Sequence, residues 1–134
     1  MTRYVIDPPT LLEIVDTELL VDVGHQLVAP NAIRSQALQL LLEQVREGSL
    51  TEKVALQRHT ALTELKMRLL GDRGSRGMAW RIAREQDWPT LREAEYFAVA
   101  RLQADAFVSV DARMAELAQG IVPVAELADL SRSG

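Results

Sequence analysis

Cysteine is absent from this chain of 134 residues. The absence excludes disulfide bonds, thiolate zinc sites and a cysteine nucleophile, and it suits a reducing compartment. No apolar run reaches the roughly 20 residues that a membrane-spanning helix needs. The layout of a signal peptide is also missing, because Asp7, Pro8 and Pro9 interrupt the N-terminal segment early. These absences predict a soluble, cytoplasmic protein without a membrane partner.

Aromatic residues are also few, and the chain has no net positive charge. Only 4% of the residues are aromatic, whereas 48% are hydrophobic, which predicts an aliphatic core. The net charge of -4 gives no overall attraction to nucleic acid, so any such binding must depend on a local basic patch. The length suits one domain, and the chain shows no internal repeat or linker. We therefore expect residues 1–134 to form a single domain.

The hydrophobic pattern predicts strands that alternate with helices. Strands are expected at residues 3–6, 25–29, 107–110 and 121–124. Helices are expected at residues 10–19, 32–46, 51–69, 78–86, 90–104 and 112–119, with a glycine loop at 71–77. The strands are apolar without alternation, which is typical of a parallel sheet covered on both faces. The predicted fold class is α/β, a three-layer α/β/α arrangement with a short, mainly parallel sheet and Pro123 at its edge.

Three acidic residues lie where this fold would gather a ligand. Asp7 ends the first strand, Asp111 follows the strand 107–110, and Glu93 lies in the first turn of the helix that Thr90 starts. In open α/β sheets, ligands bind outside the carboxyl ends of the strands. Carboxylates that converge there repel one another unless a cation is present. Magnesium prefers such oxygen ligands and activates water against phosphodiesters, so the pattern predicts a metal site in a nuclease.

Helix capping is the alternative reading of each acid. Aspartate is a preferred N-cap, because its carboxylate accepts hydrogen bonds from the free N–H groups of a helix. The pair Thr90 and Glu93 matches the reciprocal capping box. The spacing alone does not show that the acids meet, so both readings stay open at this point.

Five short motifs, in this order, resemble the PIN domain and particularly the VapC-like toxins of bacterial toxin–antitoxin pairs. They are YVID at 4–7, LVAP at 27–30, REAEYFAVA at 92–100, FVSVD at 107–111 and GIVPV at 120–124. The resemblance extends over nearly the whole chain. It implies the three-layer α/β/α fold, a magnesium- or manganese-dependent ribonuclease, an antitoxin partner and a homodimer.

Carried over residue by residue, the resemblance assigns catalysis and metal binding to Asp7, Glu93 and Asp111. Glu93 stands where the family usually has aspartate, so its carboxylate is displaced by one methylene. Gln36 stands where the family has a glutamate, and its amide offers an oxygen without a charge. Ser109 matches a position where the family often has a hydroxyl near the metal. Gln36 and Ser109 are therefore secondary site candidates.

Four arginines form the densest basic region, namely Arg73, Arg76, Arg81 and Arg84. They are candidates for RNA binding, because guanidinium groups grip phosphate oxygens bidentately. The alternative is a solvated helix face balanced by Asp72, Glu85 and Asp87. Base stacking is not indicated. Trp80 and Trp88 are expected to pack in the core or at its rim.

Two functional hypotheses follow. The first is a VapC-like, metal-dependent endoribonuclease that cleaves RNA, with Asp7, Glu93 and Asp111 around the ion. The second is a degenerate PIN domain with weak or no catalysis that binds protein or RNA, and Gln36 motivates it.

Overall fold

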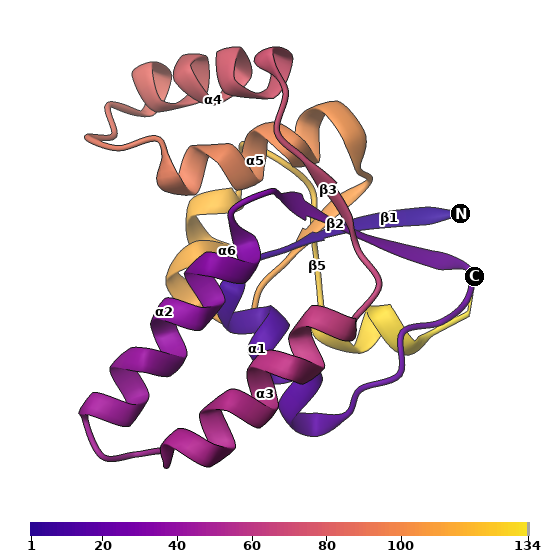
Figure 1. The fold of residues 1–134 in the computed structure, drawn as a ribbon. Coiled ribbons are helices and arrows are strands. Elements are labelled where there is room, and N and C mark those ends of the chain that lie inside the picture. Colours follow the sequence, from indigo (N-terminus) through magenta and orange to yellow (C-terminus); the bar gives the residue numbers. More distant parts are fainter. Residues whose placement is uncertain (134) are drawn as a thin grey trace.

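A parallel sheet of five strands runs through the middle of the protein, in the order β3-β2-β1-β4-β5 (Figure 1). The computed structural model describes residues 1–133. The strands are β1 (Thr2–Ile6), β2 (His25–Pro30), β3 (Arg68–Leu70), β4 (Ala106–Val108) and β5 (Val124–Ala125). The helices are α1 (Pro8–Thr17), α2 (Ile33–Arg46), α3 (Glu52–Glu64), α4 (Arg73–Gln86), α5 (Arg92–Gln103) and α6 (Ala112–Ala118), followed by a 3₁₀ helix (Leu127–Ser131).

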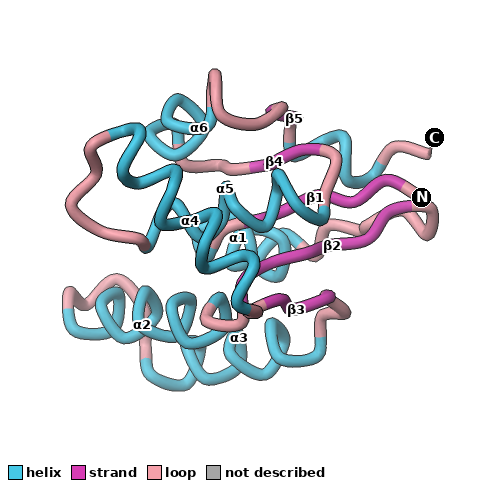
Figure 2. The backbone as a smooth tube through the Cα atoms, turned by 90° about the horizontal axis from the view of Figure 1, so that it is seen from above, coloured by secondary structure: helices cyan, strands magenta, loops and turns pink. Residues whose placement is uncertain are grey.

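Helices cover both faces of the sheet, as Figures 1 and 2 show from two directions. Helix α5 packs against β1, β2 and β4 on one face, and α4 packs on the outside of α5. Helices α1, α2 and α3 pack together on the other face. The predicted α/β fold, with three layers and a parallel sheet, is confirmed. No helix within residues 1–133 combines the length and the apolar character needed to cross a membrane.

The core lies on the central strand β1 and on its neighbours β2 and β4. Val5 and Ile6 of β1 and Phe107 and Val108 of β4 are completely buried. Consecutive strand residues point to opposite faces, so both faces of these strands are covered. Phe97 of α5 meets Phe107 edge to face, with ring centroids 5.2 Å apart. This contact fixes α5 over the sheet and so positions its first turn, which carries Glu93.

One strand was missed by the sequence analysis. The helix predicted over 51–69 ends at Glu64, and Arg68–Leu70 form β3 at the edge of the sheet. There Leu69 pairs with Ala29 of β2. In a short apolar run, periodicity does not distinguish a helix from a strand. Here the backbone pairing with β2 makes the run a strand.

The predicted glycine loop at 71–77 was wrong as well. Helix α4 already begins at Arg73, because the Asp72 carboxylate accepts a hydrogen bond of 2.8 Å from the Ser75 backbone N–H. This N-cap starts the helix ahead of Gly74 and Gly77. Both glycines therefore lie inside α4.

The two strands near the C-terminus are displaced from their predicted positions. Strand β4 ends two residues earlier than predicted, and β5 starts three residues later. The carbonyl oxygen of Pro123 accepts a hydrogen bond from the Phe107 N–H at 2.9 Å. Proline has no N–H to donate to a neighbouring strand, which is why Pro123 predicts an edge strand. The strand β5, which begins directly after Pro123, does lie at the edge of the sheet.

Candidate functional site

Asp7 follows directly on β1 and begins α1. It is the N-cap of that helix, and its Oδ1 accepts hydrogen bonds from the Thr10 backbone N–H, at 3.2 Å, and from the Thr10 hydroxyl. Its Oδ2 accepts a hydrogen bond of 2.6 Å from the Ser109 hydroxyl. Only 1% of Asp7 is exposed. The capping role is therefore real, but it leaves Asp7 at the carboxyl edge of the sheet.

The segment after β4 is tied to the segment after β1 by the same groups. The Thr10 hydroxyl oxygen accepts from the Val110 N–H at 3.1 Å. The Ser109 hydroxyl oxygen accepts from the Asp111 N–H at 3.0 Å. Because β1 and β4 are neighbouring parallel strands, Asp7 and Ser109 emerge side by side. Ser109, a secondary candidate in the sequence, thus orients the Asp7 carboxylate directly.

The environment of Asp7 opposes its negative charge. Burial raises the pKa of Asp7 above its ordinary value, and the charge of Asp111 raises that pKa further. Hydrogen bonds from Ser109 and Thr10 favour the charged form and lower the pKa, but burial outweighs them. An ionised Asp7 would therefore be stabilised by a cation placed between it and Asp111.

Glu93 and Asp111 differ in what holds them. The Asp111 Oδ1 accepts from the Arg113 backbone N–H at 2.9 Å and caps α6. The predicted capping box at Thr90 and Glu93 is not formed, because Leu91 is the N-cap of α5 and makes no side-chain cap bond. Instead the Thr90 hydroxyl donates to the Glu93 carboxylate at 3.2 Å, and the Arg113 guanidinium lies 3.6 Å from it. Glu93 is therefore held at the surface by two side chains rather than by a helix end.

The side chain of Gln36 is hydrogen-bonded to Tyr96, a contact that the sequence did not predict. The Tyr96 hydroxyl donates a hydrogen bond of 2.5 Å to the Gln36 Oε1. Burial, reinforced by the charge of Asp7, raises the pKa of Tyr96 far above its usual range. Tyr96 therefore stays neutral and remains a donor. The Gln36 oxygen, which is the ligand atom that an amide could offer to a metal, already serves as an acceptor.

The predicted residues meet in one pocket of ≈ 150 Å³. Its polar lining consists of Asp7, Gln36, Glu93, Tyr96, Asp111, Arg92 and Arg113. All three predicted acids and Gln36 are thus brought together, and Ser109 touches Asp7 from outside the lining. The four arginines predicted to bind RNA lie on α4 and do not line this pocket. We refer to this hollow as the acid pocket.

The oxygen donors that line the acid pocket are of the kind that magnesium binds. Magnesium is usually bound through one or two carboxylates, while water and substrate phosphates complete its coordination. Asp7 and Asp111 supply such a pair. Within residues 1–133, no group of three or more His, Cys, Asp or Glu side chains is placed to hold a metal ion. Metal binding by Asp7, Asp111 and Glu93 therefore stays a prediction, and the Glu93 carboxylate lies 3.6 Å from the Arg113 guanidinium.

Another protein of known structure has this architecture. The crystal structure of PAE2754 from Pyrobaculum aerophilum is similar with a TM-score of 0.73 at 19% sequence identity, and the match covers 96% of this chain and 92% of that chain. The likeness shows the fold. No protein-family model matches the sequence, and no curated protein matches it. The chemistry of the site must therefore be argued from its own residues.

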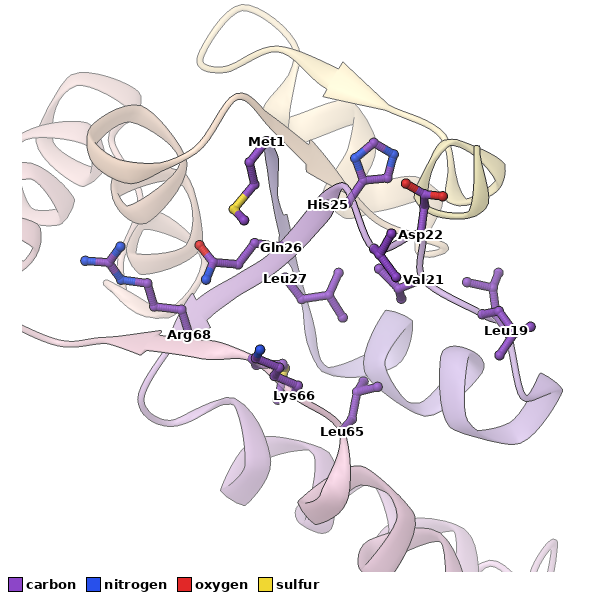
Figure 3. Close-up of a pocket in the computed structure, with 13 residues that line it drawn as sticks. Met1, Leu19, Val21, Asp22, His25, Gln26, Leu27, Leu65, Lys66 and Arg68 are labelled. Atoms are coloured by element: carbon purple, nitrogen blue, oxygen red, sulfur yellow. The ribbon is translucent and has the colours of Figure 1, made fainter. Parts of the chain in front are cut away.

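A second, larger pocket of ≈ 510 Å³ lies at the opposite, amino edge of the sheet (Figure 3). Its lining includes Met1, Leu27 and Lys66. Asp22, its one acidic side chain, accepts a hydrogen bond of 2.8 Å from the Gly24 N–H. This pocket offers no paired carboxylates, so the acid chemistry belongs to the smaller pocket at the carboxyl edge.

The raised pKa of Asp7 makes the stability of the protein depend on pH. The folded state holds the carboxyl proton of Asp7 more tightly than the unfolded state does. The contribution of Asp7 to stability is therefore full below the ordinary pKa of 3.8, and it is lost as the pH rises through the raised pKa. Asp7→Asn, which carries no charge, is therefore expected to raise the Tm at neutral pH. The gain should shrink as the pH approaches 3.8. Thermal unfolding followed by circular dichroism, with a chelator present, measures it.

Ser109→Ala is the matched comparison, because it removes a hydrogen bond that favours the charged carboxylate. It is expected to lower the Tm at neutral pH. A Tm for Asp7→Asn below that of the unchanged protein throughout the pH series would contradict the account of a destabilised charge.

Proposed function

We propose that the protein is a PIN-like, magnesium- or manganese-dependent endoribonuclease of the VapC-like kind. The observation that carries the proposal is the acid pocket, where Asp7, Asp111 and Glu93 come together at the carboxyl edge of the sheet. The two aspartates would hold the ion, and Glu93 would complete its ligands. A bound magnesium ion supplies Lewis-acid stabilisation of a phosphodiester and lowers the pKa of a water molecule.

The residues around the pocket have roles that suit a phosphodiester substrate. Ser109 and Thr10 fix the orientation of the Asp7 carboxylate. Arg92 and Arg113 line the pocket, and guanidinium groups bind phosphate oxygens in pairs. The volume of ≈ 150 Å³ is below the roughly 300–1,000 Å³ of typical small-molecule sites. The pocket therefore suits one phosphodiester group of a longer chain, and the arginines of α4 would hold neighbouring phosphates.

A degenerate PIN domain that binds RNA or protein without strong catalysis is the second candidate. The observation that favours it is Gln36, a neutral residue whose Oε1 accepts from Tyr96. The pocket therefore has less negative charge with which to hold a metal than four acids would give it.

The ribonuclease proposal predicts metal-dependent cleavage that needs Asp111. Asp111→Asn is expected to lower the rate of cleavage of an end-labelled RNA pool at least about 100-fold, the scale of losing one electrostatic catalytic group. Glu116→Gln, an exposed residue of the same helix α6, is the control and should leave the rate unchanged. Equal rates with magnesium and with a chelator would overturn the proposal.

Gln36→Glu separates the two candidates. Calorimetric titration with manganese should show metal affinity rising about 10- to 100-fold if the missing carboxylate is what weakens the site. A parallel gain in RNA cleavage would favour the degenerate reading of the natural protein. Gln57→Glu, at an exposed position of α3, adds the same charge away from the acid pocket and serves as the control. No change in either quantity would favour the active enzyme.

A homodimer and an antitoxin partner belong to the same proposal. Helices α2 and α3 carry exposed leucines, namely Leu38, Leu42 and Leu56, of which Leu56 is 55% exposed. Exposed apolar patches of this kind mark protein interfaces. Leu42→Glu is therefore expected to convert a dimer to a monomer in sedimentation equilibrium. A dimeric mass kept by this variant would exclude α2 as the contact.

A further inference from the structure

One exposed face of α4 combines arginine, glycine and tryptophan. Arg73, Gly77, Trp80 and Arg84 follow one another at intervals of three or four residues, so they lie on one side of the helix over successive turns. All four are exposed. The opposite side of α4 is buried, for example at Ala79 and Ile82, and packs on α5. We call the outer side the Trp80 face.

Trp80 does not pack in the protein as the sequence analysis expected. Its side chain is 63% exposed, whereas Trp88 is partly buried and lies 5.8 Å from the ring of Phe97. An indole buries a large apolar area when it finds a partner, so an exposed one leaves that stabilisation unused in the free protein. Tryptophan is also the residue most enriched where binding energy is concentrated.

The Trp80 face is positively charged although the protein as a whole is negative. Helix α4 carries four arginines and one glutamate, against a net charge of -4 for the chain. Across residues 1–133, no carboxylate lies within ion-pairing distance of Arg73, Arg76, Arg81 or Arg84. The predicted balance by Asp72, Glu85 and Asp87 is therefore not formed by direct pairs. The Arg76 guanidinium donates a hydrogen bond of 3.1 Å to the Gly71 carbonyl oxygen. Arg73 and Arg84, on the Trp80 face, are available to a polyanion.

Gly77 is open to solvent on the Trp80 face. A Cβ added at this position would meet no atom within 4 Å, so packing does not require glycine here. Its backbone is ordinary helix, in which glycine is less favourable than alanine. One turn from Trp80, Gly77 therefore adds no side chain that could cover the exposed surface of this part of the helix.

The amino end of α4 connects with the acid pocket through two further hollows. The first, of ≈ 220 Å³, is lined by Arg76 and Glu95, and the second, of ≈ 470 Å³, is lined by Glu95, Gln36 and Arg92. Gln36 and Arg92 also line the acid pocket. Because neighbouring hollows share these residues, a chain molecule has a path from α4 to the acids.

We propose that the Trp80 face binds single-stranded nucleic acid, with an unpaired base stacked on the Trp80 indole over Gly77 and the flanking phosphates held by Arg73 and Arg84. Stacking on an aromatic ring beside a basic surface is how proteins bind single strands with little sequence preference. An unpaired base offers a flat face to the indole and flanking phosphates to the arginines, whereas an acidic peptide offers charge alone, so exposed Trp80 between Arg73 and Arg84 favours nucleic acid. The inference deepens the proposed function, since it gives that site an unpaired strand as its substrate class.

Binding of fluorescent oligothymidylate, measured by anisotropy with a chelator present, tests the stacking. DNA and a chelator are used so that binding is measured apart from any cleavage of RNA. Trp80→Ala is expected to weaken binding about 5- to 100-fold, the scale of losing one stacked base, and Trp80→Phe should keep most of it. An abasic oligomer of the same length should bind more weakly and should be insensitive to Trp80→Ala.

Two further variants separate charge from stacking. Arg84→Gln is expected to weaken the binding of both oligomers. It should also reduce the slope of log K against log salt concentration by about 0.7, as for the loss of one phosphate contact. Arg46→Gln, exposed at the end of α2, is the matched control and should change neither. Gly77→Ala should raise the Tm by about 2–5 °C, because alanine favours the helix. It should also weaken the binding of oligothymidylate, because the proposed base lies over this position.

Three results would overturn the inference. If Trp80→Ala left the binding of oligothymidylate unchanged, no base would be stacked on Trp80. Equal affinity for the abasic oligomer would reduce the face to a plain polyanion site. Tighter binding of oligoglutamate, lost in Trp80→Ala, would assign the face to an acidic protein segment. Metal-dependent cleavage can persist in all three cases, so these outcomes are distinct from failure of the proposed nuclease.

Discussion

The pairing of β1 with β4 is the constraint on which the rest of the candidate site depends. Ile6 aligns with Val108 in this parallel pair, so the residues that follow the two strands leave the sheet side by side. Hydroxyl groups then join the two segments, with Ser109 bound to Asp7 and Thr10 bound to the backbone beyond β4. Two helices begin at this point, and each begins with an aspartate. The same few hydrogen bonds therefore end two strands, start two helices and place two carboxylates.

This arrangement combines structural and chemical roles in single residues. Asp7 and Asp111 accept the hydrogen bonds that helix N-termini need, yet both line the acid pocket. Capping and metal binding, which began as alternatives, are therefore compatible. The combination has a cost, because burial and the neighbouring carboxylate act against the charge of Asp7. Proteins often tolerate such local destabilisation where a ligand relieves it.

The sequence could predict those parts of the site that depend on local pattern. Asp7 and Asp111 were found because a short apolar run followed by an acid marks a strand end. The contact between Gln36 and Tyr96 joins residues 60 positions apart, and no local pattern reports such a distance. The start of α4 was missed because three glycines close together predicted a loop, whereas the single N-cap bond of Asp72 starts the helix. The exposure of Trp80 was missed because a helical pattern does not tell which side packs when arginine and tryptophan share one face.

The order of the strands also has a consequence for synthesis. Strand β1 is made first, but its partner β4 follows about a hundred residues later, and the bond between Ser109 and Asp7 spans 102 positions. Chains grow from the N-terminus, and contacts so distant in sequence form only after both segments have left the ribosome. An unfinished chain that carries Asp7 and Gln36 but lacks β4 therefore has no assembled pocket. The acid pocket is therefore a property of the finished fold, and no chain that stops short of β4 contains it.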